Sequence, residues 1–185
     1  MKERLGYTFS NKLNEDCNSK ARALIDDFYA SAFPSEITEL TINHAKSSIY
    51  KGLKMGIKHG IYIYDVNDEL VGLAIYEKST DDDKAISIDL IDFDPVIRKS
   101  FVDGGLDGDD KKPSDVLTRI IEIIATVSAT NHKNKVKLGL SSKTLPLATL
   151  FEQLGFKRED SELKGVNIYS KRLVNINNGR NSNNK

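Results

Sequence analysis

The chain of 185 residues has the length of one domain and is long enough to bury about two-thirds of its unfolded surface without disulfide or metal staples. Basic and acidic residues are equal in number, 27 of each, so no overall field draws the protein to nucleic acid or to an anionic membrane. A single cysteine, Cys17, excludes an internal disulfide, and no window has the apolar length of a signal peptide or a membrane span. These features predict a cytoplasmic protein.

Two amphipathic helices are expected near the start of the chain. A short strand at 4–9 precedes them. Apolar residues at three- and four-residue spacing, from Cys17 onward, predict a first helix that Pro34 stops. Ser35 can cap a second helix, which Gly56 can end. The two helices are expected to pack as a hairpin.

Three strands then follow in an antiparallel meander. Residues 61–66 and 70–78 read as strands joined by a tight turn at Asn67-Asp68. The acidic run 81–83 is interpreted as a solvated turn, because its spacing does not suggest a metal site. The third strand covers 85–94.

This third strand changes phase along its length. Ile86, Ile88 and Leu90 alternate on one face, whereas Ile91 and Phe93 continue in the opposite phase. A β-bulge produces such a switch, because one extra residue turns the later side chains over. A strand buried on both faces would also tolerate adjacent apolar residues. A bulge would splay the strand from its parallel neighbour and leave backbone N–H groups for a ligand.

The remaining elements complete a β-α-β unit and a final sheet edge. We expect a loop at 95–113, a helix at 114–130, a strand at 135–141, a short helix at 145–154 and a last strand at 165–173. The segment between the short helix and the last strand has room for one more strand. From Val174 the chain becomes Asn-rich, which predicts a disordered tail at 175–185.

The loop before the long helix is a candidate phosphate site. Gly104, Gly105 and Gly108 lie in it, and Ser114 caps the helix that follows. Free N–H groups and the macrodipole at a helix N-terminus favour negative charge. The loop also carries four aspartates, which would repel a diphosphate unless they point into water. A solvated surface insertion is the alternative.

The element order, with two short motifs, resembles the GNAT superfamily of N-acetyltransferases. Leu150-Phe151-Glu152-Gln153-Leu154-Gly155-Phe156 is similar to the family's "LYEKLGF" segment, and Leu90-Ile91-Asp92-Phe93-Asp94-Pro95 resembles the end of its fourth strand. The resemblance covers about residues 1–174, taken as one domain. It implies a mixed α/β (α+β) fold, with a mostly antiparallel sheet and helices on both faces.

The resemblance also implies acetyl-CoA as co-substrate and N-acetyl transfer to an amine by direct attack on the thioester. The residues expected to contact the cofactor are Leu90, Ile91, Phe93, Gly104, Gly105, Gly108, Ser114, Ser142 and Phe151. Two departures stand out. The family's glycines follow the fourth strand more closely, and Phe151 replaces a tyrosine that often protonates the departing thiolate.

Asp89 and Asp92 are the candidate bases for the attacking amine, because both lie on the central strand. Their alternative role is that of carboxylates hydrogen-bonded to backbone. The three histidines have no ligand spacing, so no metal site is expected.

Two functions remain open from the sequence. The first is an acetyltransferase that acts on a small-molecule or protein amine, with a homodimer as an allowed assembly. The second is a GNAT-like fold that has lost catalysis and serves as a binding or regulatory module.

Overall fold

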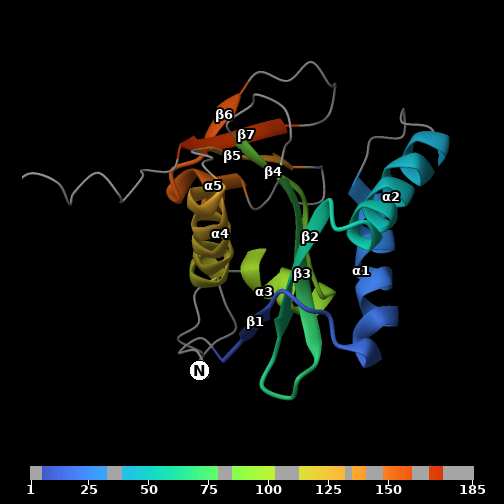
Figure 1. Ribbon diagram of the computed structural model, residues 1–185. Coiled ribbons are helices and arrows are strands. Elements are labelled where there is room, and N and C mark those ends of the chain that lie inside the picture. Colours follow the sequence, from blue (N-terminus) through green and yellow to red (C-terminus); the bar gives the residue numbers. More distant parts are fainter. Residues whose placement is uncertain are drawn as a thin grey trace, which may run out of the picture.

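The computed structural model describes residues 6–32, 39–78, 85–102, 113–131, 135–140, 148–159 and 167–172. Within them the chain forms a sheet of seven strands in the order β1-β2-β3-β4-β5-β7-β6 (Figure 1). The strands are β1 Thr8–Ser10, β2 Lys58–Tyr64, β3 Leu70–Lys78, β4 Ala85–Phe93, β5 Lys135–Leu140, β6 Lys157–Glu159 and β7 Asn167–Arg172. The helices are the 3-10 turn η1 Glu15–Cys17, α1 Asn18–Ala32, α2 Glu39–Lys54, α3 Pro95–Val102, α4 Pro113–Thr130 and α5 Ala148–Gln153.

Helices cover both faces of this sheet, and each face has its own apolar core. On one face α1 and α2 pack as a pair against β2, β3 and β4. On the other face α4 and α5 pack against the same central strands and against β5 and β7. The buried stripe of α4 is the one expected from the sequence: Leu117, Ile120, Ile121 and Ile124 are at most 5% exposed. The mixed α/β fold with helices on both faces is therefore confirmed.

The meander and its hairpin form as the sequence predicts. β3 has the predicted bounds, and β2 begins three residues earlier than expected, at Lys58. In the turn, Asp65 accepts hydrogen bonds from the backbone N–H groups of Asn67 and Glu69, at 2.8 and 2.9 Å. Asp68 takes a positive φ of 61°, a conformation that aspartate tolerates better than most residues.

The later strands also match. β4 and β5 are parallel, and every other neighbouring pair in the described sheet is antiparallel. β6 fills the place left for an extra strand before β7. The Asn-rich tail lies outside the described residues, as does the acidic run 81–83.

The predicted loop at 95–113 is wrong over its first eight residues, which form α3. The helix starts because Asp94 caps it: its carboxylate accepts the N–H of Val96 at 3.1 Å, and Pro95 occupies the first helical position, where its missing N–H costs nothing. Ile97 then packs partly buried against the core. Residues 103–112 lie outside the described part of the chain.

Candidate functional site

A β-bulge in β4 lies at the centre of the sheet. Ile75 of β3 pairs with Leu90, but the next residue, Tyr76, pairs with Ile88, so Asp89 is the extra residue. The bulge predicted from the phase switch is confirmed. It explains the pattern, because Ile88 and Ile91 both belong to the core under α4, whereas Leu90 faces α1 and α2.

The bulge coincides with the point where β4 and β5 separate. Their parallel pairing runs from Ala85 and Lys135 to Ile88 and Leu138 and then stops. From Asp89 onward, no described strand pairs with β4 on its β5 side, whereas β3 continues to pair with it on the other side. Among the described residues, the ladder between β4 and β5 therefore ends at the bulge.

Asp89 belongs to a charged cluster of three residues from three strands. The ammonium of Lys58 donates to Asp89 Oδ2 at 2.7 Å and to Glu77 Oε2 at 2.6 Å. Lys58 begins β2, and the register sets it opposite Glu77 of β3. The side chain of Lys58 is 9% exposed, against 22% for Asp89 and 33% for Glu77. One buried cation thus holds two half-buried carboxylates together at the bulge.

The position of Lys58 depends on a glycine in α2. A Cβ placed on Gly52 would lie 2.7 Å from both Cγ and Cδ of Lys58, closer than real side chains approach. The lysine stem therefore crosses α2 at the one buried residue without a side chain and carries its ammonium to the sheet. Gly52 is needed for this close approach.

Burial and charge shift the pKa values around the cluster. Burial raises the pKa of Asp89; the Lys58 ammonium acts against this rise, and Glu77 adds to it. Burial would lower the pKa of Lys58, but its hydrogen bonds to Asp89 and Glu77 outweigh that effect and raise it. On α1, burial and then the charge of Asp89 raise the pKa of Tyr29 to about 12. Asp89 is thus a stronger base than an ordinary carboxylate, and Tyr29 stays neutral at physiological pH.

Asp92 forms a separate ion pair at the end of β4. It is 1% exposed, and Arg98 of α3 places Nη2 2.8 Å from its Oδ1. The same guanidinium nitrogen donates to the carbonyl of Phe93 at 2.9 Å and lies 3.4 Å from Asp27 of α1. Asp92 Oδ1 also accepts the backbone N–H of Phe93 at 2.9 Å, which agrees with the alternative role of a carboxylate hydrogen-bonded to backbone. Its pair with Arg98 fixes α3 to the sheet.

The other expected cofactor contacts fall into two groups. Leu90, Ile91 and Phe93 have side chains buried in the two cores, so a ligand would meet their backbone rather than their side chains. Phe151 is fully buried, with its ring against Phe156 in an edge-to-face arrangement at 5.6 Å between centroids. Their roles in cofactor binding stay predictions.

Several candidate residues lie where the structure does not describe them. Gly104, Gly105, Gly108 and Ser142 are outside the described residues, and Ser114 is described only as part of the helix α4. Among the described residues, no cluster of three histidine, cysteine, aspartate or glutamate side chains is arranged to hold a metal. Nor does any described helix combine the length and apolar character that a membrane crossing requires.

Sequence reasoning missed Lys58, Glu77 and Arg98. For Lys58 a signal was present, because it shares the alternating face of β2 with Tyr62 and Tyr64. Setting the start of this strand at Ile61 left the lysine outside it. Arg98 lay in the stretch assigned to a loop.

The sheet that opens between the parallel strands β4 and β5, with a bulge at the opening and helices on both faces, has the fold of solved GNAT-family acetyltransferases. Solved structures of that fold align with almost the whole chain. They include a GNAT-family acetyltransferase from Staphylococcus aureus, with a TM-score of 0.64 at 10% identity, covering 90% of this chain and 99% of the other. An acetyltransferase from Streptococcus agalactiae aligns with a TM-score of 0.60 at 15% identity, covering 91% and 99%.

A third structure shows which ligands one protein of this fold binds. The spermidine N-acetyltransferase from Vibrio cholerae, solved in complex with CoA and spermine, aligns with a TM-score of 0.57 at 13% identity, covering 90% of this chain and 95% of the other. No family model and no curated protein matches the sequence itself. At 10–15% identity, these likenesses establish the fold.

Proposed function

We propose that this protein transfers an acetyl group from acetyl-CoA to an amine. The observation that carries the proposal is the divergence of β4 and β5 at the Asp89 bulge, in a fold that acetyltransferases share. The complex of the Vibrio cholerae enzyme with CoA supports acetyl-CoA as the co-substrate here. The thioester would lie along the open edge of β4, where backbone N–H groups can polarise its carbonyl.

Each group in the reaction then has a defined task. The neutral amine attacks the thioester carbonyl carbon, a C–N bond forms, and the C–S bond breaks as the thiolate leaves with its electron pair. Asp89 accepts the proton from the amine, directly or through a water molecule. Its raised pKa makes it a better base near neutral pH, and Lys58 holds the carboxylate in place. Phe151 has no proton to give, so the thiolate takes its proton from solvent.

A second candidate is a binding or regulatory module that has kept the fold without the catalysis. The observation that favours it is the state of the two candidate bases: Asp89 already pairs with Lys58, and Asp92 pairs with Arg98. In this case the two carboxylates stabilise the fold and take no part in a reaction.

Calorimetry with acetyl-CoA, followed by a thiol-release assay with an amine panel, separates the two candidates. The panel holds spermidine, a small primary amine and a lysine-containing peptide, which cover small-molecule and protein acceptors. Binding followed by amine-dependent thiol release, lost in Asp89→Asn with acetyl-CoA affinity retained, supports the transferase. Absence of acetyl-CoA binding, or binding without release for every amine, favours the module.

We also propose a cytoplasmic location and a homodimer. One protein of this fold, the Vibrio cholerae spermidine N-acetyltransferase, is described as a dodecamer, so a chain of this fold can self-assemble, which supports the proposal of a dimer. Light scattering on the full chain would test the dimer, and a monomeric mass would contradict it.

A further inference from the structure

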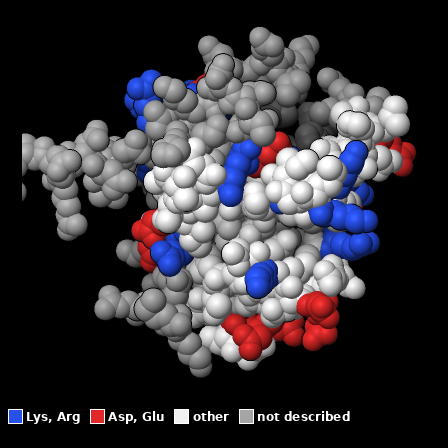
Figure 2. Space-filling view, in the orientation of Figure 1, with Lys and Arg blue, Asp and Glu red and all other residues white. Residues whose placement is uncertain are grey.

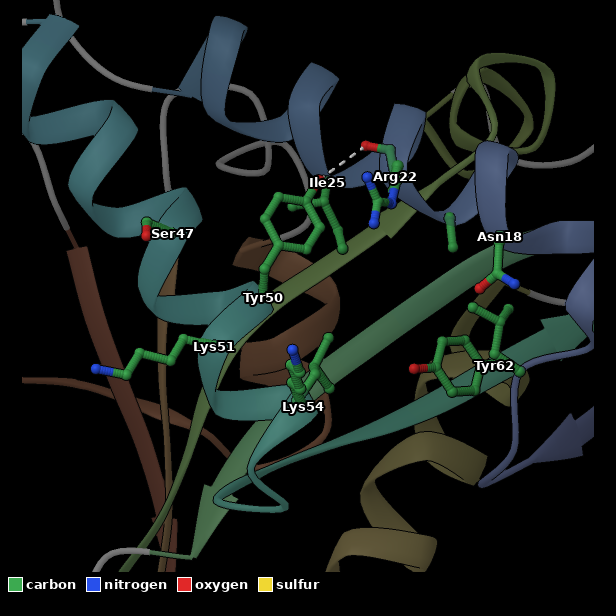
Figure 3. Close-up of a pocket in the computed structure, with 11 residues that line it drawn as sticks. Asn18, Arg22, Ile25, Ser47, Tyr50, Lys51, Lys54 and Tyr62 are labelled. Atoms are coloured by element: carbon green, nitrogen blue, oxygen red, sulfur yellow. Dashed lines mark hydrogen bonds between the residues drawn. The ribbon is translucent and has the colours of Figure 1, made fainter.

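A pocket of about 580 Å³ opens between α1 and α2, above the β2 strand (Figure 3). Its apolar lining comes from Leu13, Ala21, Ile25 and Leu53, and two tyrosines, Tyr50 and Tyr62, add aromatic rings. Its volume lies within the range of small-molecule sites, about 300–1,000 Å³. It lies on the α1–α2 face of the sheet, whereas the long helix α4 covers the opposite face.

The charged side chains that line this pocket have one sign. Arg22 of α1 and Lys51 and Lys54 of α2 line it, and no carboxylate does. Within the described part of the chain, none of these three cations has a carboxylate within ion-pair distance. One acid lies beside the pocket: Asp26 of α1 pairs with Lys46 at 2.9 Å, and its Oδ1 is 3.4 Å from the Tyr50 hydroxyl. Blue side chains gather over α1 and α2 on the right of Figure 2.

Aromatic and polar groups inside the pocket add a second feature. The Arg22 guanidinium lies 5.6 Å from the centre of the Tyr50 ring, so the cation and the aromatic face are already held together. The Tyr50 hydroxyl lies 3.4 Å from Asp26 Oδ1 and 3.5 Å from the Arg22 carbonyl oxygen, two acceptors on α1, and so ties α2 to α1 beside the pocket. Tyr62 of β2 is 9% exposed and lines the pocket from the sheet, on the side of Asn18 (Figure 3).

We propose that this pocket binds a small organic anion: a carboxylate or phosphate carried on an apolar body the size of one ring. The body would lie on Ile25 and Tyr62, and the anion would meet Arg22 and Lys54 at the rim. Guanidinium and ammonium groups without carboxylate partners favour such an anion and repel an amine. The proposal does not rest on acetyl transfer, which takes place at the divergence of β4 and β5.

Phenyl phosphate is the probe, and benzylamine is its cationic counterpart with the same ring. Tyrosine fluorescence or calorimetry measures binding, since the chain has no tryptophan. We expect saturable binding of phenyl phosphate that weakens with salt, and affinity for benzylamine lower by about tenfold or more. Equal or tighter binding of benzylamine would overturn the proposal, as would inorganic phosphate binding as tightly as phenyl phosphate.

Matched substitutions locate the site. Arg22→Gln with Lys54→Gln should weaken phenyl phosphate binding by about tenfold or more, whereas Lys99→Gln on α3, which removes an exposed charge elsewhere, should leave it unchanged. Ser47 and Ser48 are neighbouring exposed serines of α2, and only Ser47 lines the pocket. Ser47→Trp should therefore block binding and Ser48→Trp should not. Equal effects within either pair would overturn the assignment.

Competition with CoA decides whether the site is separate. CoA is itself an aromatic anion, so it could occupy this pocket. We expect saturating CoA to leave phenyl phosphate binding unchanged. Displacement by CoA would overturn the proposal of an independent site. Failure of CoA to bind at all would contradict the proposed transferase but leave the pocket proposal standing.

Discussion

The ammonium of Lys58 lies 2.7 Å from a carboxylate oxygen of Asp89, the residue that forms the bulge in β4. This pair joins the first strand of the meander to the third, and Glu77 on the strand between them completes it at 2.6 Å. A candidate catalytic carboxylate is thus held by a cation from the same chain. Any amine that uses Asp89 as a base must do so beside this lysine.

Loss of the Lys58 charge should destabilise the protein, because two carboxylates would then face each other in a half-buried site. For Lys58→Met we expect a loss of about 1–3 kcal/mol in the free energy of unfolding, measured with urea at neutral pH. Asp89→Asn in that background should recover part of the loss. Simple additivity of the two substitutions would mean that the ion pair contributes no coupling energy.

Gly52→Ala tests the packing of the lysine stem. In a helix this change normally stabilises by about 1 kcal/mol. Here the new Cβ would lie 2.7 Å from two carbons of Lys58, whose tip is fixed by two carboxylates. We therefore expect no gain, or a loss, in the free energy of unfolding. In a Lys58→Ala background the ordinary gain should return; a gain in both backgrounds would show that the lysine stem moves at little cost.

Part of this site could be predicted from the sequence, because it depends on residues that are neighbours in the chain. The phase switch between Leu90 and Ile91 predicted a bulge, since the alternation of side chains along a single strand records it. The expected face of Leu90 was wrong: the extra residue is Asp89, so Leu90 already faces α1 and α2, opposite to Ile86 and Ile88. The bounds of β3 followed equally well from an apolar run that ends at charged residues. Both features depend only on residues that are neighbours in the chain.

The parts that were missed depend on distant residues or on competing local signals. Lys58 and Glu77 are 19 residues apart, and only the register of β2 with β3 brings them together. The glycines after residue 103 suggested a loop from 95 onward, although the Asp94-Pro95 pair is itself a helix start. The complete burial of Phe151 likewise depends on how α5 packs on the core, and its place near a ligand stays a prediction from the resemblance.

Arg98 should matter more for stability than its place on a surface helix suggests. Arg98→Met would leave Asp92, 1% exposed, as a buried charge without its cation, and we expect a loss of about 3–5 kcal/mol. Lys99→Met, at the next and exposed position, is the matched control and should change stability by less than about 0.5 kcal/mol. Asp92→Asn should restore part of the Arg98→Met loss. Equal effects of Arg98→Met and Lys99→Met would contradict the importance of the buried pair.

Alkaline pH should destabilise the protein through Tyr29. Its pKa in the folded protein is raised to about 12 from 10.0, so the folded state keeps the proton longer than the unfolded state. The associated stability is complete below pH 10 and is lost as pH rises from 10 to about 12, by roughly 2–3 kcal/mol. The raised pKa of Lys58 acts in the same direction. Urea titrations across this range should show a smaller decline for Tyr29→Phe; an identical decline would exclude this tyrosine as a cause.

The last test concerns Phe151, the position where the resemblance described from the sequence would set a tyrosine. The ring is fully buried and lies edge-on against Phe156. Phe151→Tyr would add a hydroxyl inside the core, so we expect a loss of about 1–3 kcal/mol in the free energy of unfolding, with no rise in thiol release from acetyl-CoA. If stability is unchanged and thiol release rises, the ring edge reaches the thioester cleft, and Phe151 occupies the position of a catalytic acid that this chain has lost. A loss of stability without any gain in activity means that this face of α5 belongs to the buried core. In that case the proposed transfer reaction proceeds without a tyrosine to protonate the departing thiolate.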